Sequence, residues 1–440
     1  MPRVFRVARA TLLPVLLAAV CAAPAQAAHW TTVSGLIPGS ATDAALDGPR
    51  VLVTSLSGRN LVVTTIAGDR VARRQTMTTA GRAGTIRYLQ VARLRGGRAL
   101  AVWQEPGAIR ASLRPSAGAR FSPAVTVSRF PGADTGAALV PALAVTPAGE
   151  AVVAFLGGPA GGRLGIQSAT LPPGGSIWTA PVDVSAGTLP QFPGAGLSAA
   201  LPLAAVSDQA GGVVVAWGQP PVAPGSRPAL DVVSAVRSPA GVWGAPLPVG
   251  SGGFGLTLAA PAPGEFVAAW RDGPCADAAT VRGTAVALVE VVCRPGTLVG
   301  QIGLARTTSG GAVLAVLLVA QPVPGASPIE VAARDALGGW GPSRPAIAGP
   351  ADLAGAVEST GGRTAVPAVV ARGVQFNRLR VAVVGADGTV LRRIDGPARP
   401  TPPRHTSVRV LPLGPGARVA LLLTPAPTLS SSRPSILTLG

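Results

Sequence analysis

The chain has 440 residues, a formal net charge of +18, 48% hydrophobic residues and 13% charged ones. Its 57 glycines and 45 prolines are interleaved with short apolar runs, which indicates many strands joined by turns and excludes a disordered chain. All 37 basic residues are arginine, and together with the Ala, Gly and Pro bias this is typical of a high-GC coding sequence. The charge alone therefore does not indicate a polyanionic partner.

The N-terminal segment has the pattern of a secretory signal peptide. Three arginines precede a short apolar run at residues 12–20, and Ala25-Gln-Ala27 has the form of a cleavage site. We predict a signal peptide over residues 1–27 and one secreted domain over residues 28–440.

Two other membrane attachments are disfavoured by the sequence. Cys21 allows a lipoprotein alternative, but Val20 stands where a small residue is needed before a lipidated cysteine. No later apolar run approaches the ~20 residues of a membrane helix. We therefore expect no transmembrane segment.

A short phrase recurs along the chain. It begins with a turn glycine, continues with small and β-branched residues, and ends on an aromatic residue six positions after the glycine. Its clearest copies are 97–103, 149–155, 211–217 and 264–270. The phrase is apolar without alternation, which predicts a strand buried on both faces.

The opening glycine of this phrase repeats with a period near 50 residues, which is typical of a repeat architecture. It can be placed at Gly48, Gly97, Gly149, Gly211, Gly264, Gly310, Gly361 and Gly416. Each unit reads as four antiparallel strands with the phrase as the second. The units are predicted to open near residues 40, 84, 137, 196, 254, 301, 351 and 404.

Four-stranded units with buried second strands predict an all-β fold, a β-propeller of eight blades, with seven as the alternative. A β-sandwich would show alternating strands without this period, and a parallel β-helix would show a shorter one. The last unit lacks a fourth strand led by an aromatic residue, and Trp30 begins such a strand at the other end of the chain. We expect residues 30–36 to complete the last blade and close the ring.

The mature chain keeps two cysteines, Cys275 and Cys293. In an oxidising compartment they are expected to form one disulfide. Because the enclosed loop is short, its entropic contribution would be about 3 kcal/mol. Two cysteines without a neighbouring histidine do not predict a metal site, and we expect no cofactor.

Positive charge is concentrated at the two ends of the chain. Residues 28–130 and 351–440 together carry 25 Arg and 8 acidic residues, a net +17, whereas residues 131–350 carry 9 Arg and 11 acidic residues, a net −2. The two ends are neighbours in a closed ring. We take Arg70, Arg73, Arg74, Arg82 and Arg87 as a candidate basic surface for an anionic glycan or cell-envelope polymer; solvated strands with biased codon usage are the simpler interpretation.

The turns before the fourth strands weakly resemble those of secreted sialidase-like propellers, which carry a repeated Ser-x-Asp-x-Gly-x-Thr-Trp box. The corresponding segments are 172–178, 238–243 and 335–340, in which Gly and Trp are retained and we expect the Asp position to be lost. The resemblance implies a propeller fold. Catalysis in that family would imply a Tyr nucleophile, and the one tyrosine here, Tyr88, has no matching carboxylate pattern, so no catalytic residue is assigned.

Other catalytic patterns are missing from the sequence. There is no Gly-x-Ser-x-Gly elbow, no His-Glu-x-x-His and no phosphate-binding loop. The mature chain has two histidines, His29 and His405. Acidic residues beside the phrase were considered for glycoside hydrolysis and expected on one rim of the ring: Glu105, Glu150, Asp208, Glu265 and Asp272. Glu150 and Glu265 hold equivalent repeat positions, which favours a structural role.

Two functions remain open at this point. We predict a monomeric, non-enzymatic binding or scaffold module without a nucleic-acid partner. The alternative is a sialidase-like glycan hydrolase or lyase with a diverged site. A pocket poor in acidic residues with an exposed basic patch would favour the first, and convergent carboxylates with a perturbed pKa would favour the second.

Overall fold

The protein is described by a computed structural model, which covers the following residues: 30–34, 40–48, 50–67, 70–79, 86–129, 141–158, 164–187, 189, 202–221, 230–320, 328–349, 351–353, 357–359, 363–372, 376–400, 407–412, 419–424 and 435–439. Its elements are β-strands and one short 3-10 turn, η1 (Arg95–Gly97). Within these residues no helix has the length and apolar character to cross a membrane.

The strands form antiparallel sheets, which we number in chain order. The first four are β2 (Ser40–Asp47), β3 (Arg50–Ser57), β4 (Asn60–Ala67) and β5 (Arg70–Thr79); β6 (Arg87–Arg93), β7 (Ala99–Glu105), β8 (Ala108–Arg114) and β9 (Val125–Arg129); β10 (Ala142–Val145), β11 (Ala151–Gly157), β12 (Gly165–Leu171) and β13 (Val182–Asp183); and β14 (Leu203–Ser207), β15 (Val213–Gln219), β16 (Asp231–Arg237) and β17 (Leu247–Ser251).

The fifth to eighth sheets follow the same order. They contain β18 (Phe254–Ala262), β19 (Glu265–Asp272), β20 (Cys275–Arg282) and β21 (Ala285–Cys293); β22 (Thr297–Arg306), β23 (Ala312–Ala320), β24 (Ile329–Arg334) and β25 (Arg344–Ile347); β26 (Ala351–Leu353), β27 (Val357–Ser359), β28 (Arg363–Arg372), β29 (Phe376–Gly385) and β30 (Val390–Pro400); and β31 (Ser407–Pro412), β32 (Val419–Thr424), β33 (Ser435–Leu439) and β1 (Trp30–Ser34).

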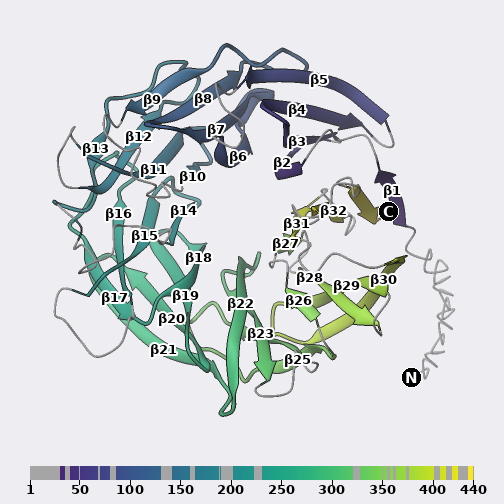
Figure 1. The fold of residues 1–440 in the computed structure, drawn as a ribbon. Coiled ribbons are helices and arrows are strands. Elements are labelled where there is room, and N and C mark those ends of the chain that lie inside the picture. The colour runs from purple at the N-terminus through teal and green to yellow at the C-terminus, as the bar shows by residue number, and fades with distance from the viewer. Residues whose placement is uncertain are drawn as a thin grey trace, which may run out of the picture.

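Of these eight described sheets, seven have four strands. The one formed by β26 to β30 has five strands. The predicted four-stranded antiparallel unit is therefore confirmed. The sheets follow one another around a common centre, with the first strand of each sheet innermost (Figure 1). The expected strand at the N-terminal end is β1, and it pairs antiparallel with β33, from Trp30 opposite Leu439 to Ser34 opposite Ser435.

The recurring phrase forms the second strand of its sheet, as predicted. All seven residues of β11 are buried, and so are the first six of β15 and of β19. The glycine before each of these strands has a positive φ, +87° at Gly149 and +91° at Gly211, which a side chain would disfavour. The glycine therefore makes the turn into the strand, and the apolar residues form the core between sheets.

The aromatic residue that ends the phrase is a buried anchor. Trp103, Trp217 and Trp270 are at most 1% exposed. The indole N–H of Trp103 donates to Glu105 Oε1 over 2.9 Å, and that of Trp217 donates to Gln219 Oε1 over 3.0 Å. A polar side chain two residues later thus satisfies the buried donor without interrupting the apolar strand.

The seventh sheet departs from the pattern because of Pro367, which lies within its second strand. Proline has no N–H to give to a strand ladder. The innermost strand is correspondingly divided: β26 pairs with residues 368–370 of β28 and β27 pairs with residues 363–365. Neither of these two described strands pairs with residues 366–367.

The outer strands differ in length and composition. β9, β13, β17 and β25 have five residues or fewer, while β5 and β30 have 10 and 11 residues and carry several arginines. β21 has nine residues and one charge, Glu290. The predicted disulfide is present and joins Cys275 to Cys293, which lie directly opposite each other on β20 and β21.

Candidate functional site

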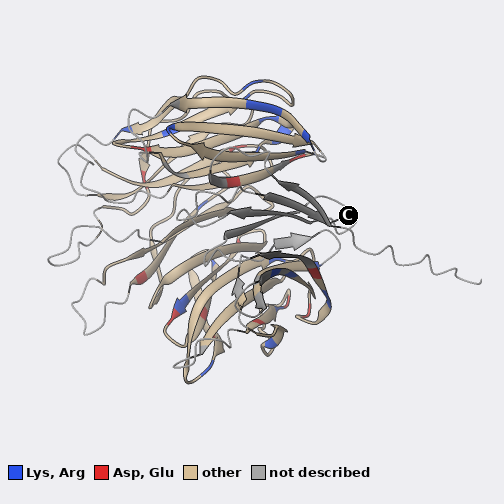
Figure 2. Cartoon of the chain, turned by 45° about the vertical axis from the view of Figure 1, so that its right-hand side comes forward, with Lys and Arg blue, Asp and Glu red and all other residues tan. Residues whose placement is uncertain are grey.

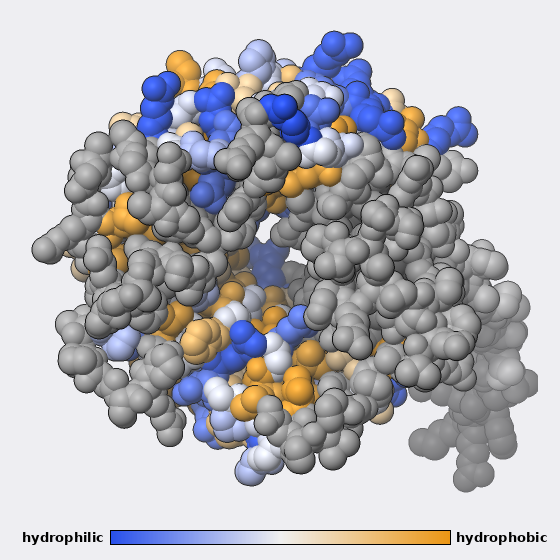
Figure 3. All heavy atoms as spheres, in the orientation of Figure 1, coloured by the Kyte–Doolittle hydropathy of each residue, from blue (hydrophilic) through white to orange (hydrophobic). Residues whose placement is uncertain are grey.

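The centre of the molecule holds a cavity of about 310 Å³. An opening is visible near the middle of the face in Figure 3. The described lining comes mainly from the innermost strands β6, β10, β14 and β18 and is largely aliphatic; its polar members are Asp43, Gln90 and Thr257. Asp43 is the one carboxylate among these described lining residues.

Asp43 is held by the protein rather than directed at a ligand. It is 1% exposed, its Oδ2 accepts the N–H of Val91 on the second sheet over 2.7 Å, and its Oδ1 accepts the N–H of Ala44. Asp208 plays a similar part further along the chain, since its Oδ2 accepts the N–H of Gly264 on the next sheet over 2.7 Å. Both carboxylates therefore connect adjacent sheets.

Three ion pairs join successive sheets at equivalent places. In each, the arginine that ends a third strand reaches the acidic residue beside the turn glycine of the preceding sheet. The pairs are Arg114–Asp47 at 2.7 Å, Arg237–Glu150 at 2.8 Å and Arg334–Glu265 at 2.5 Å. The structural role expected for Glu150 and Glu265 is thus confirmed.

The five acidic residues considered for hydrolysis do not share one rim, so that expectation was wrong. Glu150 and Glu265 lie where the second strand begins, whereas Glu105 and Asp272 end β7 and β19. The first and last residues of a strand lie at opposite ends of the sheet along the strand direction. In a seven-residue strand these two ends are about 20 Å apart. Glu150 and Glu265 hold the same position in their repeats, but the other acidic residues considered do not hold that position.

The candidate basic surface is partly on β5, the outer strand of the first sheet. Arg70, Arg73 and Arg74 are all exposed there. Arg73 Nη1 donates to the carbonyl of Gly118, and the Gln75 amide both donates to and accepts from the Phe121 backbone at 2.9 Å. Arg73 and Gln75 therefore face the second sheet, and Arg74 lies between them on the other face of the strand.

The described acidic residues of the first two sheets all have partners within the protein. Asp43 and Asp47 are buried with the partners given above, and Glu105 accepts from Trp103 and lies 3.6 Å from Arg110. Exposed arginines in the same sheets are Arg50, Arg59, Arg70, Arg73, Arg74, Arg93, Arg95, Arg120 and Arg129. Figure 2 marks basic residue positions along the strands in this part of the molecule, and Figure 3 shows hydrophilic residues on its surface. Among the described residues of these two sheets, the exposed charged residues are all arginines.

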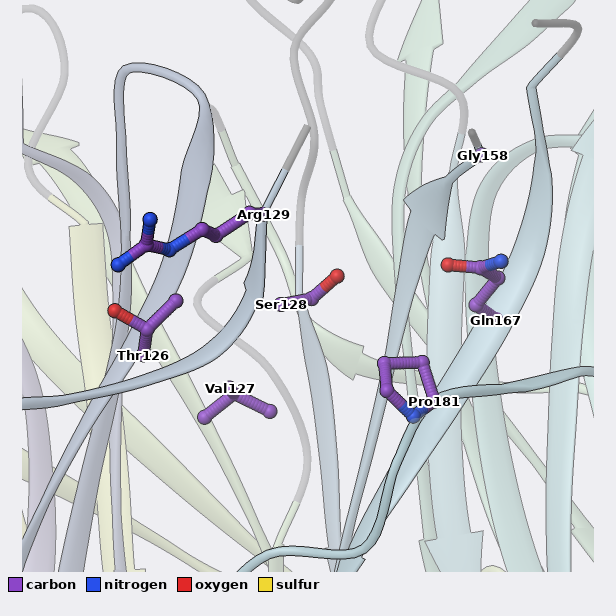
Figure 4. A pocket seen from close by; sticks show the side chains of 7 residues that line it. All are labelled: Thr126, Val127, Ser128, Arg129, Gly158, Gln167 and Pro181. Atoms are coloured by element: carbon purple, nitrogen blue, oxygen red, sulfur yellow. The ribbon is translucent and has the colours of Figure 1, made fainter. Parts of the chain in front are cut away.

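A groove of about 560 Å³ lies between the second and third sheets at their outer edges. β9 contributes Thr126, Val127, Ser128 and Arg129, and the third sheet contributes Gly158, Gln167 and Pro181 (Figure 4). None of these seven described lining residues is acidic. The sequence prediction missed this groove; the available signal was the polar Thr-x-Ser-Arg ending of β9 and a glutamine within the mostly small and apolar β12.

An acidic cluster lies beside the disulfide in the fifth sheet. Asp277 on β20 is directly opposite Glu290 on β21, and Asp272 ends the neighbouring strand β19. Burial, and secondarily the charges of Asp272 and Glu290, raise the pKa of Asp277 to about 6. Cys275 Sγ lies 3.5 Å from Glu290 Oε2, but both cysteines are engaged in the disulfide.

Replacing Asp277 with asparagine is expected to raise the melting temperature at about pH 7.5 by more than at about pH 4. Between pH ~4 and about 6 the folded protein keeps a proton on Asp277 that the unfolded chain releases. Stability is therefore lost as the pH rises through this window, and the asparagine removes that loss. Thermal unfolding monitored by circular dichroism at both pH values checks this; an equal shift at both would contradict it.

Asp335 corrects the expectation that the aspartate of the box is lost. It stands five residues before Trp340, and its Oδ1 accepts the N–H groups of Leu337 and Gly339 at 2.9 Å. The hydrogen bond from Gly339, followed by those from Gly338 and Leu337, lowers the pKa of this exposed carboxyl. The expectation is correct for the other two turns, which have no aspartate five residues before their tryptophan.

Other residues considered from the sequence are described only in part. Arg87 and Tyr88 lie on β6, the innermost strand of the second sheet, but only their backbone is described. Arg82, His29, His405, Cys21 and the predicted signal peptide lie outside the described residues.

The all-β sheets around a common centre define a β-propeller, and comparison with solved structures supports this class. An ulvan lyase from a family of polysaccharide lyases, solved with a GlcA-containing saccharide, is similar with a TM-score of 0.54 at 9% identity over 93% of this chain and 96% of that one. The WD40 domain of SCAP from fission yeast is similar with a TM-score of 0.53 at 8% identity over 94% and 98%. No family model and no curated protein matches the sequence. At these identities the likeness concerns the fold alone.

Proposed function

We propose that the protein is an exported, non-enzymatic binding module for an anionic polysaccharide or cell-envelope polymer, and that the outer face of the first sheet makes the contact. One observation carries this proposal. In the described part of the first two sheets the acidic side chains are held by internal partners, while nine arginines are exposed. A surface of one sign attracts polymers of the opposite sign.

Two other features support this proposal. The disulfide is typical of an oxidising, extracellular compartment, where such polymers occur. The fold of an ulvan lyase solved with a GlcA-containing, and hence anionic, saccharide shows that propellers of this shape are compatible with such ligands. The hydrolase or lyase alternative lacks support from the central cavity, whose described lining has a single carboxylate that is already hydrogen-bonded.

We also propose that the eight sheets are the blades of one ring over residues 28–440, closed by β1. The register of β1 with β33 supports this, because it gives the last sheet its fourth strand from the other end of the chain. Closure would place the basic first sheet beside the eighth, so that the positively charged chain ends form one continuous sector of a monomeric ring.

Reversing the charge of Arg70, Arg73 and Arg74 together to glutamate is expected to weaken binding to an immobilised polyuronate or sulfated polysaccharide by roughly 10–100-fold. Each lost contact removes about 0.5–1 kcal/mol of surface attraction, with added repulsion from the carboxylates. Surface plasmon resonance at several salt concentrations measures this, and wild-type binding should weaken as salt increases.

The matched control compares Arg74→Glu with Arg344→Glu, which is also exposed and lies on β25 in the sixth sheet. Only the first substitution should reduce binding appreciably. Equal losses for both would mean that net charge rather than this face is responsible. Cleavage of any tested polysaccharide by the purified protein would overturn the non-enzymatic part of the proposal.

A further inference from the structure

The third sheet has a short outer strand beside the groove that it forms with the second sheet. β13 has only two residues, and it pairs with β12 only at Gln167 and Ser168. Pro181 precedes it and cannot donate to a ladder, and Gly158 contributes no side chain to the opposite wall. The outer segment of the third sheet otherwise follows β12 through single backbone hydrogen bonds from Thr179, Val184 and Ser185 rather than through a long ladder.

Three polar side chains on the groove have hydrogen-bonding capacity that the described protein atoms do not use. They are the Arg129 guanidinium, the Ser128 hydroxyl and the Gln167 amide. Ser128 is 7% exposed as a whole residue, and it lines the groove. Thr126 differs, because its hydroxyl accepts a hydrogen bond from Arg110 Nη1. In Figure 4, Gln167 lies across the groove from Arg129, with Ser128 between them.

The walls thus combine one guanidinium, hydroxyl groups and an amide, with an aliphatic floor from Val127 and Pro181. The volume of about 560 Å³ falls in the range of small-molecule sites. A guanidinium binds a carboxylate or sulfate with two parallel hydrogen bonds, while hydroxyl and amide groups match sugar hydroxyls. Arg129 is the one charged residue among the described lining residues.

We propose that this groove is a subsite for one acidic sugar residue, with Arg129 binding its carboxylate or sulfate and Ser128 and Gln167 binding its ring hydroxyls. The proposal rests on the proposed function, since it assigns a specific contact to the polymer that the basic face attracts. The β5 arginines would then supply long-range attraction, and the groove would supply selection of the sugar.

The test uses the full mature protein and a short glucuronate oligosaccharide as the probe, with a neutral oligosaccharide of the same length beside it. Isothermal titration calorimetry of Arg129→Gln should show affinity for the acidic probe weakened about tenfold or more, because a charge-assisted pair is lost. Ser128→Ala and Gln167→Ala should each weaken it by a few-fold. Arg344→Gln, an exposed arginine on β25 that lies outside the groove and outside the first two sheets, is the matched control and should bind as wild type.

The outcomes separate the groove from the proposed function. Unchanged affinity of Arg129→Gln for the acidic probe, together with loss of polymer binding in the β5 variant, would overturn the groove and leave the proposed function standing. Equal wild-type affinity for the acidic and neutral probes would also overturn the role of Arg129. If wild-type protein binds neither polymer nor probe, both proposals fail. Unchanged melting temperatures of the variants establish that the losses are not due to unfolding.

Discussion

Replacing Arg114 with methionine is expected to lower the free energy of unfolding by about 3–5 kcal/mol. The Arg114 side chain is 3% exposed and that of Asp47 is 5% exposed. Arg114 Nη1 and Nη2 donate to the two Asp47 oxygens over 2.9 and 2.7 Å, and Nη2 also donates to the carbonyl of Gly97. The methionine leaves the Asp47 carboxylate buried without its partner, which is the costly part of the change. Chemical denaturation followed by tryptophan fluorescence measures it.

The double variant Asp47→Leu with Arg114→Met separates the cost of the unpaired Asp47 carboxylate from the cost of the lost Arg114 packing. An apolar pair of similar volume removes both buried charges, so we expect most of the lost stability to return. A double-mutant cycle with the single variants gives the coupling energy. If the double variant is as unstable as Arg114→Met alone, the loss comes from packing and from the Gly97 contact rather than from the stranded carboxylate.

Removing β1 is expected to have an effect of similar size. A chain that begins at residue 35 loses five residue pairs with β33. With about five backbone hydrogen bonds at ~0.5–1.5 kcal/mol each, the free energy of unfolding should fall by roughly 3–7 kcal/mol. It should also leave β33 as an open edge, which favours association between chains. Thermal unfolding and size-exclusion chromatography check both consequences against a chain that begins at residue 28.

A moved strand provides the control for the β1 deletion. β1 is antiparallel to β33. Residues 28–36 can therefore be attached after residue 440 through a short turn and form the same antiparallel pairs with β33. We expect this rearranged chain to recover the stability of the chain that begins at residue 28. A deletion that leaves thermal unfolding unchanged would contradict ring closure by β1.

Much of the fold could be predicted because the repeat consists of residues whose backbone conformation and burial follow from their type. The turn glycines need a positive φ, and the residues after them are apolar on both faces, so their place as second strands follows from local rules. The disulfide followed from there being two cysteines in the predicted mature chain. The division of the first strand of the seventh sheet was not predicted, although Pro367 was its visible cause.

The candidate site was harder to predict because it depends on contacts between sheets. The sequence does not distinguish the buried arginines from the exposed ones. Only contact with the neighbouring sheet makes three of them paired and buried, namely Arg114, Arg237 and Arg334. The groove draws its lining residues from two units, so no single unit shows it. A single sequence shows residue types within a unit but not which positions of successive units meet.

The three ion pairs join alternate neighbours among the first six sheets. They join the first sheet to the second, the third to the fourth and the fifth to the sixth, whereas the contact from Asp208 to Gly264 between the fourth and fifth sheets is a single hydrogen bond to backbone. The pairs lie far apart along the chain and share no residue, so the stability losses from removing different pairs should add.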